Sequence, residues 1–114
     1  MFEYNAFVTR VIDGDTIEVE IDLGFNQQSN GVRLRIRGIN APELDKAGEK
    51  AAGQESKMFL AKMIEGKPVK VHTFKTKTGR DVKTFERYVA DVFINGLNVA
   101  ELMLNAGHAV PMKG

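Results

Sequence analysis

The sequence predicts a mainly β fold of the α+β class, a five-stranded Greek-key β-barrel with two helices. Five short segments alternate apolar and polar residues with the period and length of strands. Two further segments repeat apolar residues with a helical period, one between the third and fourth strands and one after the fifth. Turn-forming residues separate these segments, so the order is three strands, a helix, two strands and a helix.

The first three strands are predicted over residues 6–12, 17–23 and 32–37. Asp13-Gly14-Asp15-Thr16 favours a tight turn between the first two, because glycine tolerates a positive φ between two turn-favouring aspartates. Residues 24–31 are polar and bounded by glycines, which is typical of a flexible hairpin loop. These three strands are therefore expected to form a meander.

The second half of the chain begins with a polar segment, residues 44–53, which is expected to be a mobile loop. A helix is predicted over 54–65, ending at Gly66 and Pro68. Strands over 69–74 and 85–94 flank a basic turn at 75–84. Asn95-Gly96 predicts a tight turn, and Asn98 is the expected N-cap of a short helix that ends at Gly107.

Length and composition favour one soluble domain over residues 1–114. A chain of 114 residues, 43% hydrophobic and 27% charged, can bury a sizeable core. No apolar run approaches the ~20 residues of a membrane span, so no membrane partner is expected. The chain has no cysteine, so any metal must take oxygen or imidazole ligands. No signal peptide is visible, so a cytoplasmic protein is expected if the chain is full length, although the compartment stays open.

The segment V-R-L-R-I-R-G-I-N-A-P-E, residues 32–43, carries the clearest functional signal. Its strand half places apolar residues on one face and Arg33, Arg35 and Arg37 on the other. Gly38 and Pro42 then end the strand, and Asn40 and Glu43 supply oxygen atoms next to the basic face. The competing interpretation is a half-buried strand with an ordinary solvated face. Residues 67–87 are also predominantly basic, which favours either a polyanionic partner or a solvated hairpin.

Five short strands with a helix after the third match the OB-fold, whose groove commonly binds oligonucleotides. The residues themselves resemble the staphylococcal nuclease-like, or thermonuclease, family of the bacterial and phage type, from about Val8 to Ala109. Four motifs carry the resemblance: V-I-D-G-D-T at 11–16, R-L-R-I-R-G-I-N-A-P-E at 33–43, F-E-R-Y-V-A-D-V at 85–92, and G-L-N-V-A-E-L-M-L-N-A-G-H-A at 96–109.

This resemblance implies a calcium-dependent endonuclease that hydrolyses DNA and RNA at the 5′ oxygen of the phosphodiester. Ca²⁺ is a hard cation that prefers oxygen ligands, which Asp15, the Asn40 side chain and the Ala41 carbonyl would supply. Glu43 matches the family residue that activates or positions the attacking water. Arg35 and Arg87 match the two arginines that bracket the phosphate, and Thr16 matches a residue near the metal.

The motifs also depart from the family pattern. Asn40 stands where the family usually has a second metal-binding aspartate, which removes one formal charge and is expected to weaken calcium binding. An aromatic-glycine-arginine motif is replaced by Phe85-Glu86-Arg87. The other polar candidates are interpreted as turn, surface or general electrostatic residues: Asp13, Arg33, Arg37, His72 and His108.

Three hypotheses follow. The favoured one is a small metal-dependent nuclease, a monomer acting on DNA or RNA, with single strands preferred. The second is a catalytically weak nucleic-acid-binding OB module, which Asn40 favours. The third is a protein-binding domain, for which the sequence holds no positive signal.

Overall fold

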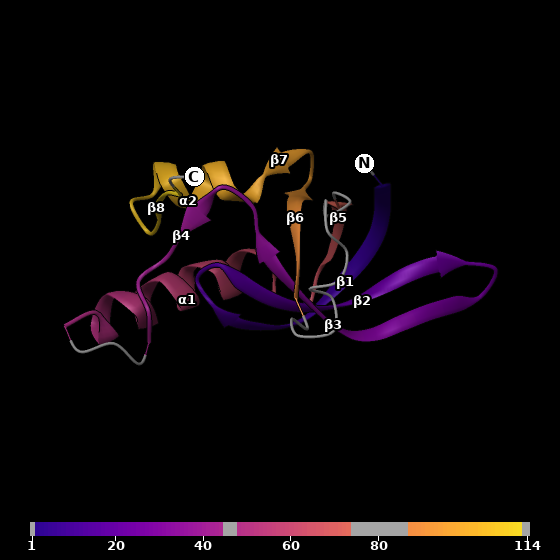
Figure 1. Ribbon diagram of the computed structural model, residues 1–114, viewed down its shortest axis with the longest axis horizontal. Helices are drawn as coiled ribbons and strands as arrows, with labels where there is room; N and C mark the ends of the chain where they lie inside the picture. The colour runs from indigo at the N-terminus through magenta and orange to yellow at the C-terminus, as the bar shows by residue number, and fades with distance from the viewer. Residues whose placement is uncertain (1, 45–47, 74–86, 113–114) are drawn as a thin grey trace.

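The computed structural model describes residues 2–44, 48–73 and 87–112 (Figure 1). Its main feature is a closed β-barrel of five long strands. In chain order they are β1 (Phe2–Asp13), β2 (Thr16–Gly24), β3 (Gln27–Ile36), β5 (Pro68–Thr73) and β6 (Arg87–Ile94). Together with two helices, this arrangement is the OB-fold that the order of sequence patterns predicts.

The strand pairing explains how the barrel closes. β1 lies between β2 and β5 and is antiparallel to both, β2 pairs with β3, and β5 pairs with β6. The ring is completed by a parallel pairing of β3 with β6, in which Arg33 lies opposite Arg87 and Ile36 opposite Ala90. The end of the arginine strand is thereby brought next to the strand that begins at Arg87.

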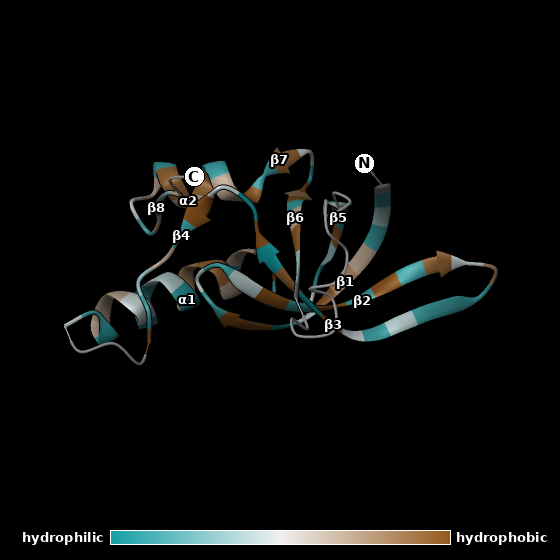
Figure 2. Cartoon of the chain, in the orientation of Figure 1, coloured by the Kyte–Doolittle hydropathy of each residue, from teal (hydrophilic) through white to brown (hydrophobic). Residues whose placement is uncertain are grey.

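The core follows from the alternation of residues along these strands (Figure 2). Ile17, Val19 and Ile21 of β2 are buried, and Leu34 and Ile36 of β3 have no exposed surface. The arginines between them lie on the outer face, as the period-two pattern predicts. Other fully buried side chains come from several elements: Val8, Val11, Ile39, Leu60, Ile64, Val71, Val92 and Met103.

The two helices cover the barrel with their apolar sides. α1 (Lys50–Ile64) packs against β1 and buries one stripe of residues, which comprises Gly53, Ser56, Leu60 and Ile64. The short α2 (Val99–Asn105) buries Val99, Ala100 and Met103. The Asn98 side chain accepts a hydrogen bond from the Glu101 N–H at 3.3 Å, which confirms the predicted N-cap.

Three two-residue strands complete the fold. β7 (Leu97–Asn98) follows the predicted Asn95-Gly96 turn, in which both residues have positive φ. β4 (Ile39–Asn40) pairs with β8 (Val110–Pro111) in a separate small ladder. Figure 1 shows this ladder beside α2, on the opposite side of the barrel from the long β2–β3 hairpin. The sequence did not predict β4, β7 or β8, since two residues are too few to show a period.

The flexible loop predicted at 24–31 is wrong. β2 and β3 continue through most of it, and the turn is only Phe25-Asn26, where both residues have positive φ. The register shifts by a bulge near Gly31, which has φ 67°. The run is polar because the hairpin projects into solvent (Figure 2), not because it lacks structure, and Phe25 at its tip is 99% exposed.

The predicted start of the first helix is also wrong, since α1 begins at Lys50 rather than at residue 54. Gly53 suggested a loop but lies inside the helix.

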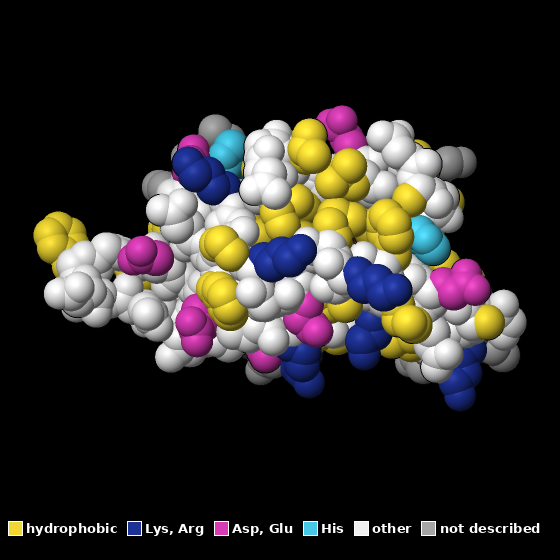
Figure 3. Space-filling model, turned by 180° about the vertical axis from the view of Figure 1, so that it is seen from behind, with side chains coloured by type: hydrophobic (Ala, Val, Ile, Leu, Met, Phe, Trp, Pro, Cys, Tyr) yellow, Lys and Arg dark blue, Asp and Glu magenta, His cyan; other side chains and the backbone are white. Residues whose placement is uncertain are grey.

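Two features noted in the sequence lie outside the described residues: Glu86, which departs from the family motif, and the basic turn at 75–84. In the described part of the chain, neither helix is long and apolar enough to cross a membrane. The face opposite to that of Figure 1 carries hydrophobic side chains interspersed with lysine and arginine (Figure 3).

Candidate active site

The β1–β2 turn holds one aspartate almost completely buried. The Asp15 N–H donates to Asp13 Oδ1 at 3.0 Å, which closes a tight turn within the D-G-D-T motif. The Asp15 carbonyl accepts from the Ile36 N–H at 2.8 Å and so ties this turn to the end of β3. Asp15 as a residue is only 8% exposed, although it carries a carboxylate. A buried carboxylate needs hydrogen-bond donors or a cation to compensate its charge.

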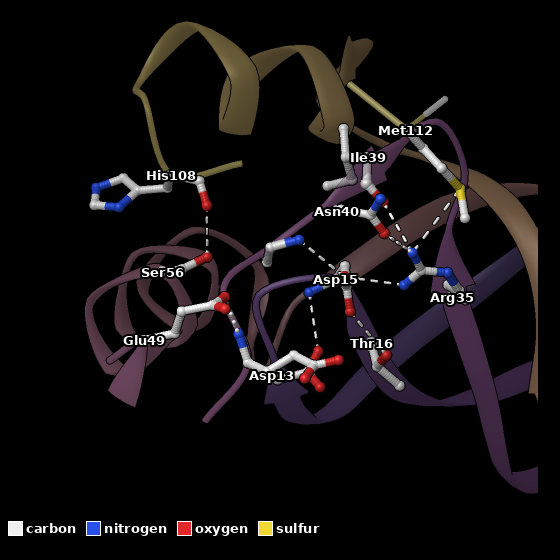
Figure 4. A network of polar contacts seen from close by, with 12 residues as sticks. Asp13, Asp15, Thr16, Arg35, Ile39, Asn40, Glu49, Ser56, His108 and Met112 are labelled. Carbon is white, nitrogen blue, oxygen red and sulfur yellow. Dashed lines mark hydrogen bonds and ion pairs between the residues drawn. The ribbon is translucent and has the colours of Figure 1, made fainter. Parts of the chain in front are cut away.

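The compensation comes from three segments of the chain (Figure 4). The Thr16 hydroxyl donates to Asp15 Oδ1 at 3.2 Å. The Ala41 N–H donates to Oδ2 at 3.0 Å, and Arg35 Nη1 forms an ion pair with the same oxygen at 2.9 Å. Turn, strand end and the segment after β4 therefore meet at one carboxylate group.

Arg35 also bonds to β4. Its Nη2 donates to the Ile39 carbonyl at 3.1 Å and to the Asn40 side-chain oxygen. Met112 Sδ lies 3.9 Å from the same nitrogen. The Arg35 side chain is 18% exposed, so its guanidinium lies between Asp15 and Asn40 and is largely shielded from solvent.

The two aspartates of the turn have pKa values shifted in opposite directions. Burial raises the pKa of Asp13, and its hydrogen bond with the Asp15 side chain raises it further. Burial alone would also raise the pKa of Asp15. Hydrogen bonds from the Asp13 side chain, the Ala41 N–H and Arg35 outweigh that effect, so the net pKa of Asp15 lies below its ordinary value. Asp15 is therefore the more acidic carboxyl group of the two.

Glu43 lies just beyond this cluster, in the loop between β4 and α1. Its side chain is exposed, and its N–H donates to Glu49 Oε1 at 3.3 Å. The loop passes directly over α1, because a β-carbon on Gly53 would lie 3.1 Å from the carbonyl group of Glu43. A larger residue at position 53 would require the loop to shift by a few tenths of an ångström.

The C-terminal residues support the site from behind. β8 places Val110 opposite Asn40 and Pro111 opposite Ile39. The Met112 N–H donates to the Gly38 carbonyl at 2.9 Å. The buried Ser56 hydroxyl of α1 donates to the His108 carbonyl at 2.8 Å. The position of Asn40 thus depends on residues some seventy positions later in the chain.

The structure brings four of the predicted site residues together: Asp15, Arg35, Asn40 and Ala41. Glu43 follows in the adjacent loop. The backbone of Arg87 lies in β6 opposite Arg33, on the strand next to Arg35; its side chain is outside the described part of the structure. Arg37 forms an ion pair with Asp91 at 3.4 Å, and His108 stacks on Phe59, in agreement with structural roles for both.

The sequence patterns did not point to Gly53, Ser56 and Met112 as supports of the site. A signal for Gly53 was available, since a glycine inside a helix costs stability and usually has a packing reason. Gly14 was assigned to the turn for the wrong reason. Its φ is not positive, and glycine is needed there because a β-carbon would lie 2.0 Å from Ser56 Oγ.

The oxygen atoms of this cluster are the kind of ligand that a hard cation prefers. Asp15 Oδ2 contacts Nη1 of Arg35 and Asn40 Oδ1 accepts from Nη2, so both oxygens already face one positively charged group. A carboxylate and an amide oxygen suit calcium. Within residues 2–44, 48–73 and 87–112, no three or more His, Cys, Asp or Glu side chains form a metal-binding group. Of the proposed ligands Asp15, Asn40 and Ala41, Asp15 is the one that supplies a charged oxygen.

A family model described as staphylococcal nuclease homologue matches residues 33–113, which is most of the chain. The chain belongs to this family. A rice protein (Oryza sativa subsp. japonica) named Probable staphylococcal-like nuclease CAN2 is 43% identical over 81 residues, 71% of this chain and 19% of that protein. A protein of Escherichia coli O157:H7 named Uncharacterized endonuclease is 34% identical over 103 residues, 90% of this chain and 57% of that protein.

The Staphylococcal nuclease domain-containing protein 1 of Schizosaccharomyces pombe (strain 972 / ATCC 24843) is 31% identical over 113 residues, 97% of this chain but 12% of that protein. The chain thus spans about a fifth or less of the plant and yeast relatives named here. The match to the staphylococcal nuclease model begins at Arg33 and therefore includes Arg35, Asn40 and Glu43, whereas Asp15 precedes it.

Proposed function

We propose that this protein is a calcium-dependent endonuclease that hydrolyses phosphodiester bonds of DNA and RNA at the 5′ oxygen. Membership of the staphylococcal nuclease family and the endonuclease-named relative support a nuclease function. The observation that carries the proposal is the cluster of Asp15, Arg35 and Asn40 at the rim of the barrel, with Glu43 exposed beside it. A buried anion, a cation and an exposed carboxylate at one place are the groups that phosphodiester hydrolysis needs.

In this proposal, Asp15, Asn40 and the Ala41 carbonyl would hold the calcium ion. When bound, calcium would neutralise charge on the scissile phosphate. Glu43, which is exposed and next to the cluster, accepts a proton from the attacking water. Arg35 and Arg87 donate N–H groups to the phosphate oxygens, whose negative charge rises in the transition state.

The nucleic acid is expected to be bound as a single strand by a monomer of the protein. A flexible single strand can bring a phosphate to the cluster without opening a duplex. Comparing cleavage of single-stranded DNA, duplex DNA and RNA of equal sequence tests the substrate preference. Sedimentation of the active protein tests the oligomeric state.

The deciding experiment is cleavage of single-stranded DNA in calcium, with and without a chelator, by the parent chain and by Glu43→Gln and Arg87→Ala. Each variant is expected to lose ~10²-fold or more in rate. Matched controls are Glu55→Gln, which removes an exposed carboxylate on α1, and Arg10→Ala, which removes an exposed arginine on β1. Full activity after chelation, or folded variants as active as the parent, would contradict the proposal.

The second candidate is a nucleic-acid-binding OB module without useful catalysis. Asn40 favours it, because one formal charge is missing from the metal site and its oxygen is already bonded to Arg35. This candidate gains support if the protein binds single-stranded DNA in calcium but cleaves no faster than a chelated sample.

A further inference from the structure

The guanidinium of Arg35 is surrounded by protein oxygen atoms. Nη1 contacts Asp15 Oδ2 at 2.9 Å, while Nη2 contacts the Ile39 carbonyl at 3.1 Å and the Asn40 side-chain oxygen. The two hydrogens of Nη2 are thus directed at two acceptors within the protein. A phosphate oxygen that used these N–H groups would have to replace Ile39 and Asn40 as acceptor.

Two of these oxygens are also the proposed ligands of calcium. Asp15 Oδ2 and Asn40 Oδ1 cannot serve a divalent cation and the guanidinium at once, because the two positive groups would lie within a few ångströms of each other in a largely buried place. The Ala41 N–H reaches the same Asp15 oxygen from the other segment, so no further position on that oxygen is evident for a second cation.

We propose that Arg35 is the built-in cation of this site, and that it leaves Asp15 and Asn40 when a divalent ion binds and then becomes available to the phosphate. The inference rests on the proposed metal site and adds an order of events: metal binding first, arginine release second, phosphate contact third. Arg35 would therefore couple the two binding events, so that calcium strengthens phosphate binding and phosphate strengthens calcium binding by the same factor.

The position of Arg35 permits this exchange. It is the next-to-last residue of β3, on the outer face of the barrel, and it lies opposite Val89, which is 43% exposed. Arg33 is exposed on the same face of the same strand. In the proposed exchange, a change of rotamer would turn the long Arg35 side chain from the rim toward the face that carries Arg33.

Asn40 keeps the binding of the Arg35 guanidinium weak enough for a divalent ion to replace it. An uncharged amide oxygen binds a guanidinium less strongly than a carboxylate would. In the described part of the chain, the charged partner of Arg35 is Asp15. The metal-free protein thus keeps a neutral pair of Asp15 and Arg35, and a divalent ion can replace the guanidinium. A second carboxylate at position 40 would hold Arg35 more firmly.

The test is calorimetric titration of calcium into metal-free protein without nucleic acid. Arg35→Met removes the competing cation at similar volume and is expected to bind calcium on the order of ten times more tightly than the parent. Arg33→Met removes the same charge from the same face of the strand. Screening in solvent should keep its effect within about twofold at 0.15 M salt. Equal gains in both variants would mean that only general charge matters and would overturn the inference.

A second measurement needs no substitution in the site. In the parent protein, the side-chain N–H resonances of Arg35 should be slow to exchange and resolved by NMR when metal is absent, because the guanidinium is held by oxygens. When calcium binds, the separate Arg35 resonances are expected to merge, because the guanidinium is no longer held. The Arg37 resonances, which report the ion pair with Asp91, should stay unchanged. Unchanged Arg35 resonances at saturating calcium would overturn the inference and leave the metal site intact. If calcium binds neither the parent nor Arg35→Met, the proposed metal role fails as well.

Discussion

Gly14 lies so close to Ser56 that a β-carbon on the glycine would be 2.0 Å from the serine hydroxyl oxygen. The turn that holds Asp15 is therefore packed directly on the middle of α1. The same hydroxyl donates to the His108 carbonyl, so the turn, the helix and the segment that leads into β8 meet at one buried serine. This contact fixes the aspartate relative to the strand pair behind Asn40.

Gly14→Ala should destabilise the protein by about 2–3 kcal/mol, because the added methyl overlaps Ser56 and the Ala41 side chain, and neither can move freely. Denaturant titration measures the loss. The double variant Gly14→Ala/Ser56→Gly should lose less than the two single variants summed, since it removes the nearest overlapping atoms. A Gly14→Ala variant as stable as the parent would contradict this packing.

Gly53→Ala tests the contact between α1 and the loop that carries Glu43. Alanine favours a helix over glycine by about 1 kcal/mol, but its methyl would lie 3.1 Å from the Glu43 backbone. We expect a smaller gain in stability than the loss caused by Ala52→Gly at the adjacent exposed helix position. Cleavage should fall several-fold or ~10-fold, because the loop must shift. If Gly53→Ala gained the whole ~1 kcal/mol of helix stability and cleaved at the parent rate, the contact between Gly53 and the Glu43 loop would be unimportant.

Asp13→Asn tests the raised pKa of Asp13. The folded state binds this proton more tightly than the unfolded state does, so ionised Asp13 destabilises the fold above its folded pKa. Asparagine should therefore stabilise the metal-free protein at pH 7. The advantage should shrink as the pH falls through the folded pKa and vanish below the ordinary value of 3.8.

Urea denaturation in chelator at several pH values measures this difference. Asp22→Asn is the matched control, because Asp22 also accepts a hydrogen bond from the N–H two residues later but is exposed. Equal pH profiles for the two variants would rule out burial of Asp13 as the cause.

Asn40→Asp should tighten calcium binding by roughly 1–3 kcal/mol, since it adds a second anionic oxygen to the proposed site. The gain should be smaller in the parent than in the Arg35→Met background, because the new carboxylate also binds Arg35 more strongly. Calorimetric titrations of both pairs provide the comparison. A calcium affinity that does not rise in either background would mean that residue 40 does not face the metal.

The barrel strands could be predicted because their side chains alternate between core and solvent. Ile17, Val19 and Ile21 are all buried, as the pattern of the second strand requires. The same rule failed for the β2–β3 hairpin, where strand residues face solvent on both sides and leave no alternation to read. It also missed β4 and β8, which form because they pair with each other.

Part of the candidate site could also be predicted from the alternation of side chains along a strand. Arg35 could be placed on the outer face from its own strand, and the resemblance to the nuclease family related it to Asp15 and Asn40. The bond between Arg35 and Asn40 could not be foreseen, because it depends on how β4 is held by β8 and Met112. Gly53 misled the helix prediction, since its packing against Glu43 outweighs its low propensity.

The pairing of β4 with β8 determines when the candidate site can form in a newly synthesised chain. Asp15 and Arg35 are synthesised early, but the residues that back Asn40 and accept the Ser56 hydrogen bond come only with His108 and the strand after it. Such distant contacts form late, because closing a long loop costs entropy before the contact compensates it. A ribosome-bound chain that has just completed β6 therefore carries every barrel strand and still lacks a finished site.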